Sequence, residues 1–320
     1  MKVKDLPRLD LTKVRLNSLA ERHSKVKISD FAKPLNPGAS FGDFAASLPN
    51  ILAGASLKDA ARAIARARSA GKLVMLAMGG HPIKVGLGPV LVDLMEKGFI
   101  NSISTNGSVM VHDTEVALVG VTSEDVGQFL GDGDFGVTRE TGAIINQAAR
   151  EAGATNTGLG YCLGKLLHSL NPPHWRASVV TNAYHLGIPF TVHVALGSDV
   201  YHIHPDAHGA SMGQATFEDF HTFCRLVAAL ENGVFINLGS AVIMPEVFLK
   251  AISLSRNLGY FQENLTTINL DFIHQYRPRV NVVERPVASS GKGFNFTGHH
   301  EIMFPLLLNL AQEYLQNPPE

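Results

Sequence analysis

The sequence is poor in cysteine and in charge, and each shortage excludes a class of protein. Two cysteines among 320 residues, Cys162 and Cys224, are too few for a disulfide framework or a cysteine-rich zinc site. Charged residues make up 17% of the chain, against ~25% in an average protein. Lysine plus arginine (27) nearly balances aspartate plus glutamate (28). No overall basic field is therefore available to hold nucleic acid or an anionic membrane.

A long apolar run of the transmembrane kind is also missing. The longest uncharged stretch, residues 177–198, contains Gly187 and Pro189 as well as several polar residues, which favours helix, turn and strand over a membrane span. The first sixteen residues mix charges and lack the apolar core of a signal peptide. We expect a soluble, cytoplasmic protein. The low charge for a chain of this size indicates surface that is buried between subunits.

Secondary-structure patterns divide the chain into an N-terminal arm or cap, residues 1–50, and an α/β domain, residues 51–320. Strands are expected over residues 72–77, 101–105, 189–195, 234–238 and 266–271, and helices over 57–67, 88–97, 113–119, 139–152, 160–170, 178–185, 217–231, 246–257 and 301–315. Short apolar strands that alternate with helices predict a doubly wound, mostly parallel, Rossmann-like sheet with helices on both faces.

Glycine and serine gather where these strands end. Ligands of an open parallel sheet bind beyond the carboxyl ends of its strands, and glycine lets the backbone approach them closely. The loops predicted at this edge are residues 78–88, 105–113, 196–199, 238–240 and 288–293. They include Gly79, Gly80, Gly239 and Ser240 as candidate cofactor residues. The glycines match neither a dinucleotide fingerprint nor a Walker A loop, but five such loops favour a ligand of dinucleotide size.

Histidines and aspartates cluster in residues 193–208. His202 and His204 are two positions apart and would share one face of an extended segment, and with His208 and Asp206 they could bind Zn, Mn or Fe. The same side chains could instead bind substrate or transfer protons without a metal. A metal-dependent hydrolase therefore stays open as an alternative function.

Lys292 lies between two glycines in a Ser/Gly segment. A lysine with a depressed pKa can form an imine with a carbonyl compound, whereas a surface lysine or a phosphate contact would need no such shift. The residues alone leave both interpretations open.

Several segments resemble the deoxyhypusine synthase family. Thr105-Asn-Gly-Ser-Val-Met-Val-His-Asp113 is similar to the family's Thr-Gly-Ala-Asn-Leu-x-His-Asp segment. The order of segments is also similar, from Leu-Val-Asp-Leu-Met-Glu-Lys-Gly-Phe-Ile before it to residues 178–189, Leu196-Gly-Ser-Asp199, Leu238-Gly-Ser-Ala-Val and Ile302-Met-Phe-Pro-Leu-Leu after it. The resemblance covers roughly residues 56–315.

The resemblance implies an NAD-binding Rossmann-like domain in a homotetramer. It implies NAD-dependent transfer of a 4-aminobutyl group from spermidine through a lysine imine, with a small-molecule amine as donor and a protein lysine as possible acceptor. Carried over by position, it places Thr105, Asn106, Gly107, Ser108, Asp113, Gly197, Ser198 and Asp199 by the cofactor, and Lys292 nearest to the imine lysine. The tryptophan that precedes the family's lysine is absent here, so we expect a diverged substrate.

Three hypotheses about function follow. The first is an NAD-dependent transferase of the deoxyhypusine synthase type that uses Lys292 for covalent catalysis, with Glu246 and His204 for amine binding and proton transfer. The second is the metal-dependent hydrolase. The third is a non-catalytic nucleotide-binding oligomer that keeps the fold alone.

Overall fold

The computed structural model describes residues 3–318 and divides the chain into two units between Ala55 and Ser56. The first unit contains three short 3-10 helices, η1 (Val3–Asp5), η2 (Leu11–Lys13) and η3 (Ile28–Asp30), followed by α1 (Phe41–Ser47). Ser40 and Asp43 form a capping box that starts α1. Apolar side chains of this unit are largely exposed, including Leu9 (87%) and Leu16 (89%).

The second unit is built on one six-stranded sheet. Its strands are β1 (Val74–Met78), β2 (Ser102–Asn106), β3 (Phe190–His193), β4 (Val234–Leu238), β5 (Thr266–Asp271) and β6 (Lys292–Thr297). They lie in the order β3-β2-β1-β4-β5-β6, and every neighbouring pair is parallel. The fold is therefore the doubly wound, Rossmann-like α/β fold that the sequence predicts, with a wholly parallel sheet among the described residues.

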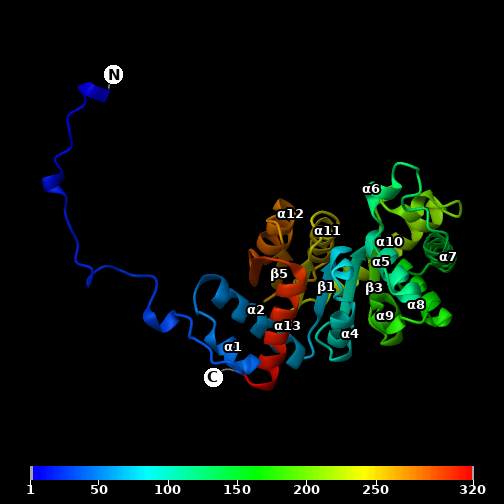
Figure 1. Ribbon diagram of the computed structural model, residues 1–320, viewed down its shortest axis with the longest axis horizontal. Coiled ribbons are helices and arrows are strands. Elements are labelled where there is room, and N and C mark those ends of the chain that lie inside the picture. The colour runs from blue at the N-terminus through cyan, green and yellow to red at the C-terminus, as the bar shows by residue number, and fades with distance from the viewer. Residues whose placement is uncertain (1–2, 319–320) are drawn as a thin grey trace. The chain divides into compact units, whose positions relative to one another are not determined.

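Helices connect the strands and cover the sheet. They are α2 (Leu52–Ser69), which runs across the division between the units, then α3 (His81–Lys84), α4 (Gly88–Glu96), α5 (Gly107–Val119), α6 (Val126–Phe129), α7 (Arg139–Thr155), α8 (Leu159–Leu170), η4 (Trp175–Ala177), α9 (Val179–His185), η5 (Val200–Ile203), α10 (Gly209–Ala228), α11 (Ile243–Asn257), α12 (Tyr276–Pro278), the π-helix η6 (Arg279–Glu284), η7 (Arg285–Val287) and α13 (His300–Gln316). Figure 1 shows α11 and α12 on one side of the strands and α4, α9 and α13 on the other.

The core lies on both faces of the sheet. All residues of β1, β3 and β4 are buried, which is the pattern of strands covered on two sides. On one face, the ring of Phe235 in β4 stacks on Phe248 of α11 with centroids 3.7 Å apart, and Phe223 of α10 packs edge-on against Phe235. None of the described helices is both long and apolar enough to cross a membrane.

Two local predictions are wrong, and both concern the candidate site. Residues 107–112 continue α5 instead of forming a loop, because Val109, Met110 and Val111 are buried and the helix starts directly at Gly107. Residues 292–297 form β6, where the sequence analysis placed a loop that ends at residue 293. Helix α10 also begins at Gly209, eight positions before the predicted start at residue 217.

Candidate functional site

Four loops meet at the carboxyl ends of the strands, on either side of the point between β1 and β4 where the strand order reverses. A Cβ atom placed on Gly79, after β1, would lie 3.0 Å from the carbonyl oxygen of Gly239, after β4. One placed on Gly80 would overlap the hydroxyl of Ser108, after β2. Gly79 meets the backbone of Gly239 and Gly80 meets the side chain of Ser108, so a larger residue at either position would crowd the neighbouring loop. This edge is where a doubly wound sheet binds its ligands.

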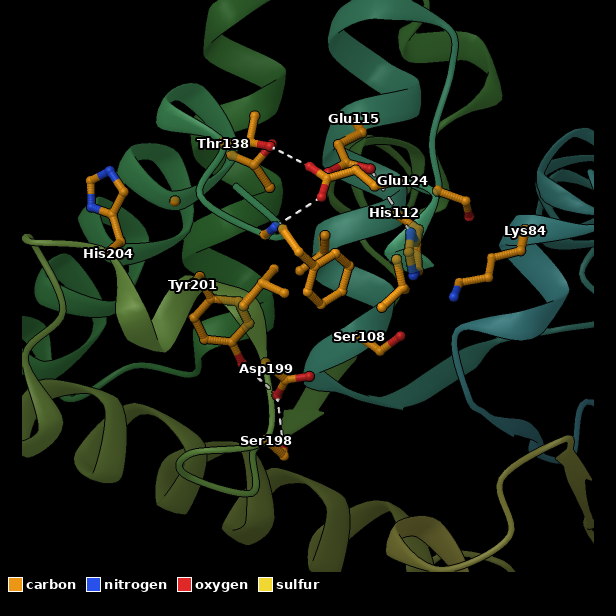
Figure 2. Close-up of a pocket in the computed structure, with 18 residues that line it drawn as sticks. Lys84, Ser108, His112, Glu115, Glu124, Thr138, Ser198, Asp199, Tyr201 and His204 are labelled. Carbon is orange, nitrogen blue, oxygen red and sulfur yellow. Dashed lines mark hydrogen bonds and ion pairs between the residues drawn. The ribbon is translucent and has the colours of Figure 1, made fainter. Parts of the chain in front are cut away.

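A cavity of about 200 Å³ lies beside this crevice, at the start of α5. Figure 2 shows polar and charged side chains around it, among them Lys84, Ser108, His112, Glu115 and Asp199. The cavity is smaller than the ~300–1,000 Å³ of pockets for drug-sized ligands. Its size suits a small molecule, and the few charged side chains on an otherwise largely apolar wall would orient it.

A chain of hydrogen bonds fixes His112 in the cavity wall. Thr122 Oγ1 donates to Glu115 Oε2 at 2.5 Å and lies 2.8 Å from His112 Nδ1. Because the only proton of the Thr122 hydroxyl is directed to Glu115, its oxygen accepts from Nδ1–H of His112. The other ring nitrogen, Nε2, is then the unprotonated one. Burial, and secondly the nearby Lys84 ammonium, lower the pKa of His112 to about 4, so the imidazole is neutral near pH 7.

Asp199 stands over the first residue of α5. Its carboxylate accepts a hydrogen bond from the Tyr201 hydroxyl at 3.1 Å, and a Cβ on Gly107 would overlap both groups. Burial raises the pKa of the Asp199 carboxyl, although the hydrogen bond from Tyr201 opposes the rise. A bound cation would favour the ionised form of Asp199, so a positively charged group gains binding energy here.

The segment after α5 closes another side of the cavity. Glu124 accepts hydrogen bonds from Gly136 N at 2.8 Å and from Thr138 Oγ1 at 2.9 Å, which joins the two ends of this segment. Val126 and Phe135 then add apolar surface to the cavity wall. The segment shields the charged side chains from bulk water.

The structure places part of the predicted cofactor set at this edge. Thr105 and Asn106 end β2, and the Asn106 Oδ1 atom is buried without a hydrogen-bond partner. Gly107, Ser108, Ser198 and Asp199 contact or line the cavity. Gly197 belongs to the same loop as Ser198, and its N–H donates to His202 Nδ1. Gly79, Gly80, Gly239 and Ser240 lie at the crevice, where Ser240 Oγ also accepts from Met244 N at the start of α11.

Asp113 is not at this edge. Its carboxylate is fully buried and accepts hydrogen bonds from Ser178 Oγ, Val179 N and Val180 N at 2.5, 2.8 and 3.0 Å. These contacts fix the start of α9 against α5. Asp113 therefore stabilises the packing of α9 against α5 and, among the described residues, does not contact the predicted cofactor loops.

Lys292 lies at the opposite edge of the sheet. It is the first residue of β6 and pairs with Thr266, the first residue of the parallel strand β5. Its N–H donates to Leu265 O at 3.0 Å, and its side chain is exposed. Because β6 continues to Thr297 before it reaches the carboxyl edge, the structure separates Lys292 from the cavity by the length of a strand.

Glu246 also lies outside the cavity. It is in the first turn of α11, where it accepts from Lys250 Nζ at 2.6 Å and from Asn281 Nδ2 at 3.0 Å. Arg277 adds an ion pair at 3.3 Å. Lys250 first, with Arg277, lowers the pKa of Glu246. The carboxylate is thus part of an ion-pair network between α11 and the segment that follows β5.

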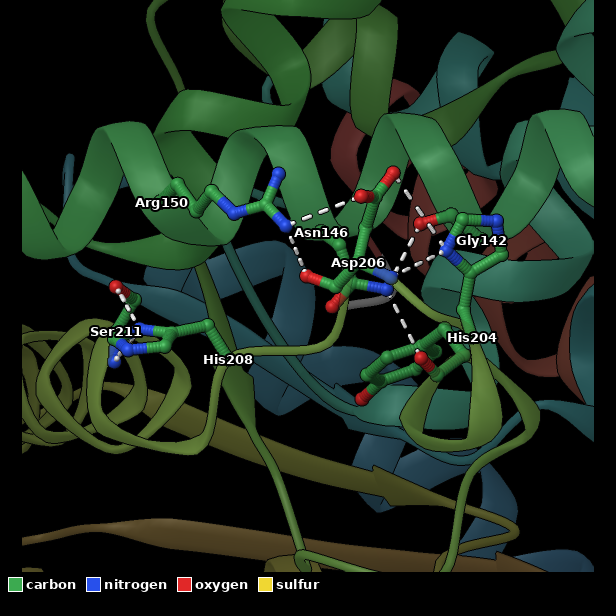
Figure 3. A network of polar contacts seen from close by, with 8 residues as sticks. Gly142, Asn146, Arg150, His204, Asp206, His208 and Ser211 are labelled. Atoms are coloured by element: carbon green, nitrogen blue, oxygen red, sulfur yellow. Dashed lines mark hydrogen bonds and ion pairs between the residues drawn. The ribbon is translucent and has the colours of Figure 1, made fainter.

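The predicted metal ligands point to different partners (Figure 3). His204 packs over Gly142 in the cavity wall, and its Nδ1 accepts from Asp206 N. Asp206 pairs with Arg150, while His208 caps α10 through Ser211 N. The Nδ1 atom of His202 accepts from Asp199 N and Gly197 N. Within residues 3–318, no three histidine, cysteine or acidic side chains are arranged to hold a metal ion, so this geometry does not support the hydrolase alternative.

Sequence reasoning missed most of the residues that line the cavity, among them the polar side chains of Lys84, His112, Glu115 and Tyr201. His112 follows Ser108 by four positions, a spacing that places both on one face of a helix. The signal was hidden because residues 107–112 were predicted to be a loop. Thr122 and Glu115 are brought to His112 by the turn after α5, which no spacing rule reveals.

No protein-family model and no curated protein matches the sequence, whereas solved structures do. AgrE, in a ternary complex with ornithine and NAD⁺, has a TM-score of 0.53 at 14% identity over 83% of this chain and 34% of AgrE. A conserved LOR/SDH-type protein from Methanococcus maripaludis S2 has a TM-score of 0.51 at 15% identity over 91% of this chain and 75% of that chain.

A candidate deoxyhypusine synthase from Entamoeba histolytica has a TM-score of 0.49 at 12% identity over 87% of this chain and 95% of that one, and no argument rests on it. The matched region is about a third of the length of AgrE. Identities this low show a shared fold and nothing finer. Function must therefore be argued from the site.

Proposed function

We propose that this protein is an NAD-dependent enzyme that oxidises a small amine in the cavity at the start of α5. One observation carries the proposal. A carboxyl group, Asp199, and a neutral imidazole, His112, line one small cavity beside the crevice of a doubly wound sheet. A carboxylate that binds an ammonium group and a base that accepts its proton are the two groups that amine oxidation requires of a protein.

Dinucleotides bind a doubly wound sheet at the point where its strand order reverses, which here is the crevice between β1 and β4. At the start of α5, side chains of Asp199 and Tyr201 cover Gly107. At the crevice, Gly79 and Gly239 meet through their backbones. The buried ring of His300 packs on Gly239, and neither of its nitrogens has a hydrogen-bond partner.

We assign the loops of Gly79, Gly80, Gly239 and Ser240 to NAD, the cofactor present in the AgrE complex. When bound, NAD supplies the acceptor for a hydride. Gly80 touches Ser108, so these loops adjoin the cavity. The protein need only bring the reacting carbon of the substrate to this boundary.

The side chains of the cavity have separate roles in the proposal. Asp199 binds the substrate ammonium group, and the buried carboxyl is ionised by the cation that it binds. His112 accepts a proton from the substrate nitrogen at Nε2, while Thr122 and Glu115 hold the ring in the required tautomer. The segment held by Glu124 limits access of water.

The proposal stops at oxidation. The transfer that the family resemblance implies would need the lysine that the resemblance assigns to the imine, Lys292, at the cavity; the lysine that lines the cavity, Lys84, is not that residue. Lys292, the residue nearest to that role by position, begins β6 at the far edge of the sheet. Transfer to a lysine of another protein would also need this enzyme-bound imine, so the proposal does not include a protein acceptor.

Two measurements on the purified protein test the proposal: binding of NAD by calorimetry, and formation of NADH with primary amines that carry or lack a carboxylate. Asp199→Asn should lower the rate constant at low substrate by roughly 10- to 100-fold, because a charge-assisted contact worth about 1.5–3 kcal/mol is lost. Asp206→Asn is the matched control, since Asp206 is exposed and pairs with Arg150 outside the cavity. Absence of NAD binding at millimolar cofactor contradicts the proposal.

A further inference from the structure

The cavity carries a cation as well as its acidic groups. Lys84 ends α3 and lines the cavity with an exposed side chain. Figure 2 shows its ammonium end turned toward His112 and Ser108. Among the described residues, no carboxylate lies within ion-pair distance of Lys84, although most lysines near acidic groups here, such as Lys97 and Lys250, are paired. Its positive charge is therefore free to bind an anion.

Ser108 lines the same cavity, and Figure 2 shows it on the side toward which the Lys84 ammonium group turns. Ser108 is in the first turn of α5, and its Oγ occupies the space that a side chain at position 80 would fill. No protein group among the described residues accepts a hydrogen bond from Ser108. A hydroxyl donor on the same side of the cavity as an unpaired ammonium matches the two oxygens of a carboxylate.

A negative charge, the Asp199 carboxylate, lies at the other end of the first turn of α5. Asp199 contacts Gly107, one residue before Ser108, and Figure 2 shows Ser108 between Asp199 and Lys84. The cavity thus presents a cation and a hydroxyl donor on one side and a carboxylate on the other. A plain amine would leave the cation without a partner and would be repelled by it. A ligand that carries both an ammonium group and a carboxylate satisfies both sides.

We infer that the substrate is an α-amino acid, whose carboxylate binds Lys84 and Ser108 and whose ammonium group binds Asp199. The inference rests on the proposed function for the chemistry, but it concerns binding and can be measured without turnover. The cavity volume of about 200 Å³ suits a free amino acid. Lys84 is then the residue that distinguishes an amino acid from the corresponding amine.

Calorimetry with matched probes tests the inference on the intact protein. L-leucine is compared with isoamylamine, which lacks the carboxylate, and with 4-methylpentanoate, which lacks the amine; L-lysine is compared with cadaverine. We expect the amino acid to bind about 10- to 100-fold more tightly than its amine, as one charge-assisted contact allows. In Lys84→Met this preference should disappear, because the amino acid loses the contact to its carboxylate and the amine binds at least as tightly as in wild type once the repelling charge is removed.

Lys97→Met is the matched control, because Lys97 ends α4 away from the cavity and pairs with Asp93. Equal affinity of wild type for amino acid and amine overturns the inference, as does a preference that survives in Lys84→Met. Failure of the proposed function looks different: the preference for amino acids remains, but NAD does not bind and no NADH forms. If neither probe class binds at millimolar concentration, both the inference and the proposed function are overturned.

Discussion

The imidazole of His112 shares a hydrogen bond with the hydroxyl of Thr122, with 2.8 Å between Nδ1 and Oγ1. Thr122 in turn donates to Glu115. Thr122 belongs to the turn that follows α5. The segment that closes the cavity therefore also determines which tautomer the His112 side chain adopts. A change in that segment should alter proton transfer before it alters binding.

Substitutions at His112 and Thr122 test this relay. His112→Gln should lower kcat by roughly 10²- to 10⁴-fold, the usual contribution of a general base. Thr122→Val keeps the imidazole but frees its tautomer, so we expect a decrease of about tenfold in kcat with KM nearly unchanged, on the general-base scale. Thr155→Val, at the exposed end of α7 and outside the cavity, serves as the control for Thr122→Val. A change in KM alone would assign Thr122 to substrate binding instead.

Asp113 should contribute to stability and leave binding intact. Asp113→Ala leaves Val179 N, Val180 N and the Ser178 hydroxyl without their acceptor in a buried site. The free energy of unfolding should fall by about 2–4 kcal/mol, as measured by urea denaturation. The folded fraction should bind NAD as wild type does. If the Asp113→Ala protein is as stable as wild type but binds NAD more weakly, Asp113 contributes to the cofactor site as the family resemblance implies.

Lys292→Ala should have little effect. The side chain is exposed at the start of an edge strand, so we expect a change in unfolding free energy within about 0.5 kcal/mol and unchanged formation of NADH. Borohydride reduction in the presence of substrate, followed by peptide mass spectrometry, should find no adduct at position 292. An adduct there would support the covalent role that the family resemblance implies.

Asp219 makes stability depend on pH. Burial raises the pKa of its carboxyl to about 7, while hydrogen bonds from Gly160 N and Val192 N oppose the rise. Because the folded-state pKa is higher than the ordinary aspartate pKa of 3.8, folding favours the protonated form. The contribution of Asp219 to stability is complete below pH 3.8 and is lost as the pH rises through about 7.

The stability of wild type relative to Asp219→Asn should therefore decrease by on the order of 3 kcal/mol between pH 4 and pH 7. Comparing the two proteins removes the opposite effect of His193, whose pKa is lowered to about 3 by burial. Denaturation curves at several pH values give the difference directly. A difference that stays constant over this range would show that Asp219 is already ionised in the folded protein.

The sequence predicts the buried strands well because their physical signal is local. The runs that become β4 and β5 are short, rich in β-branched residues and almost wholly buried, and they are predicted with their observed bounds. β6 was missed because it lies at the edge of the sheet and is half exposed, so only Phe296 is buried. Phe294 and Phe296 do alternate with polar residues, which is the weaker signal of such a strand. Because β6 was not predicted, Lys292 was expected at the carboxyl ends of the strands, whereas it lies at their amino ends.

The candidate site could be predicted in part, at the strand-end glycines and at Ser108, Ser198 and Asp199, which line the cavity. The glycines after β1 and β4 indicate close backbone approach, and the structure brings their loops together. His112 and Lys84 enter the cavity through helix start points and a turn that the sequence pattern does not define. Contacts such as that of Asp199 with Gly107 join residues far apart in the chain, and no local pattern encodes them.

The order of the strands has a consequence for synthesis on the ribosome. β1 ends at Met78, but one of its two neighbours, β4, begins only at Val234. A nascent chain that has reached residue 200 contains β1, β2 and β3, yet one edge of β1 has no strand to pair with and Met75 has no cover from α10 or α11. Exposed strand edges and apolar faces recruit other chains. β1, which is central in the finished sheet, is thus the strand most open to aggregation in the nascent chain. It stays unpaired on one edge while the long segment from α5 to α9 is synthesised.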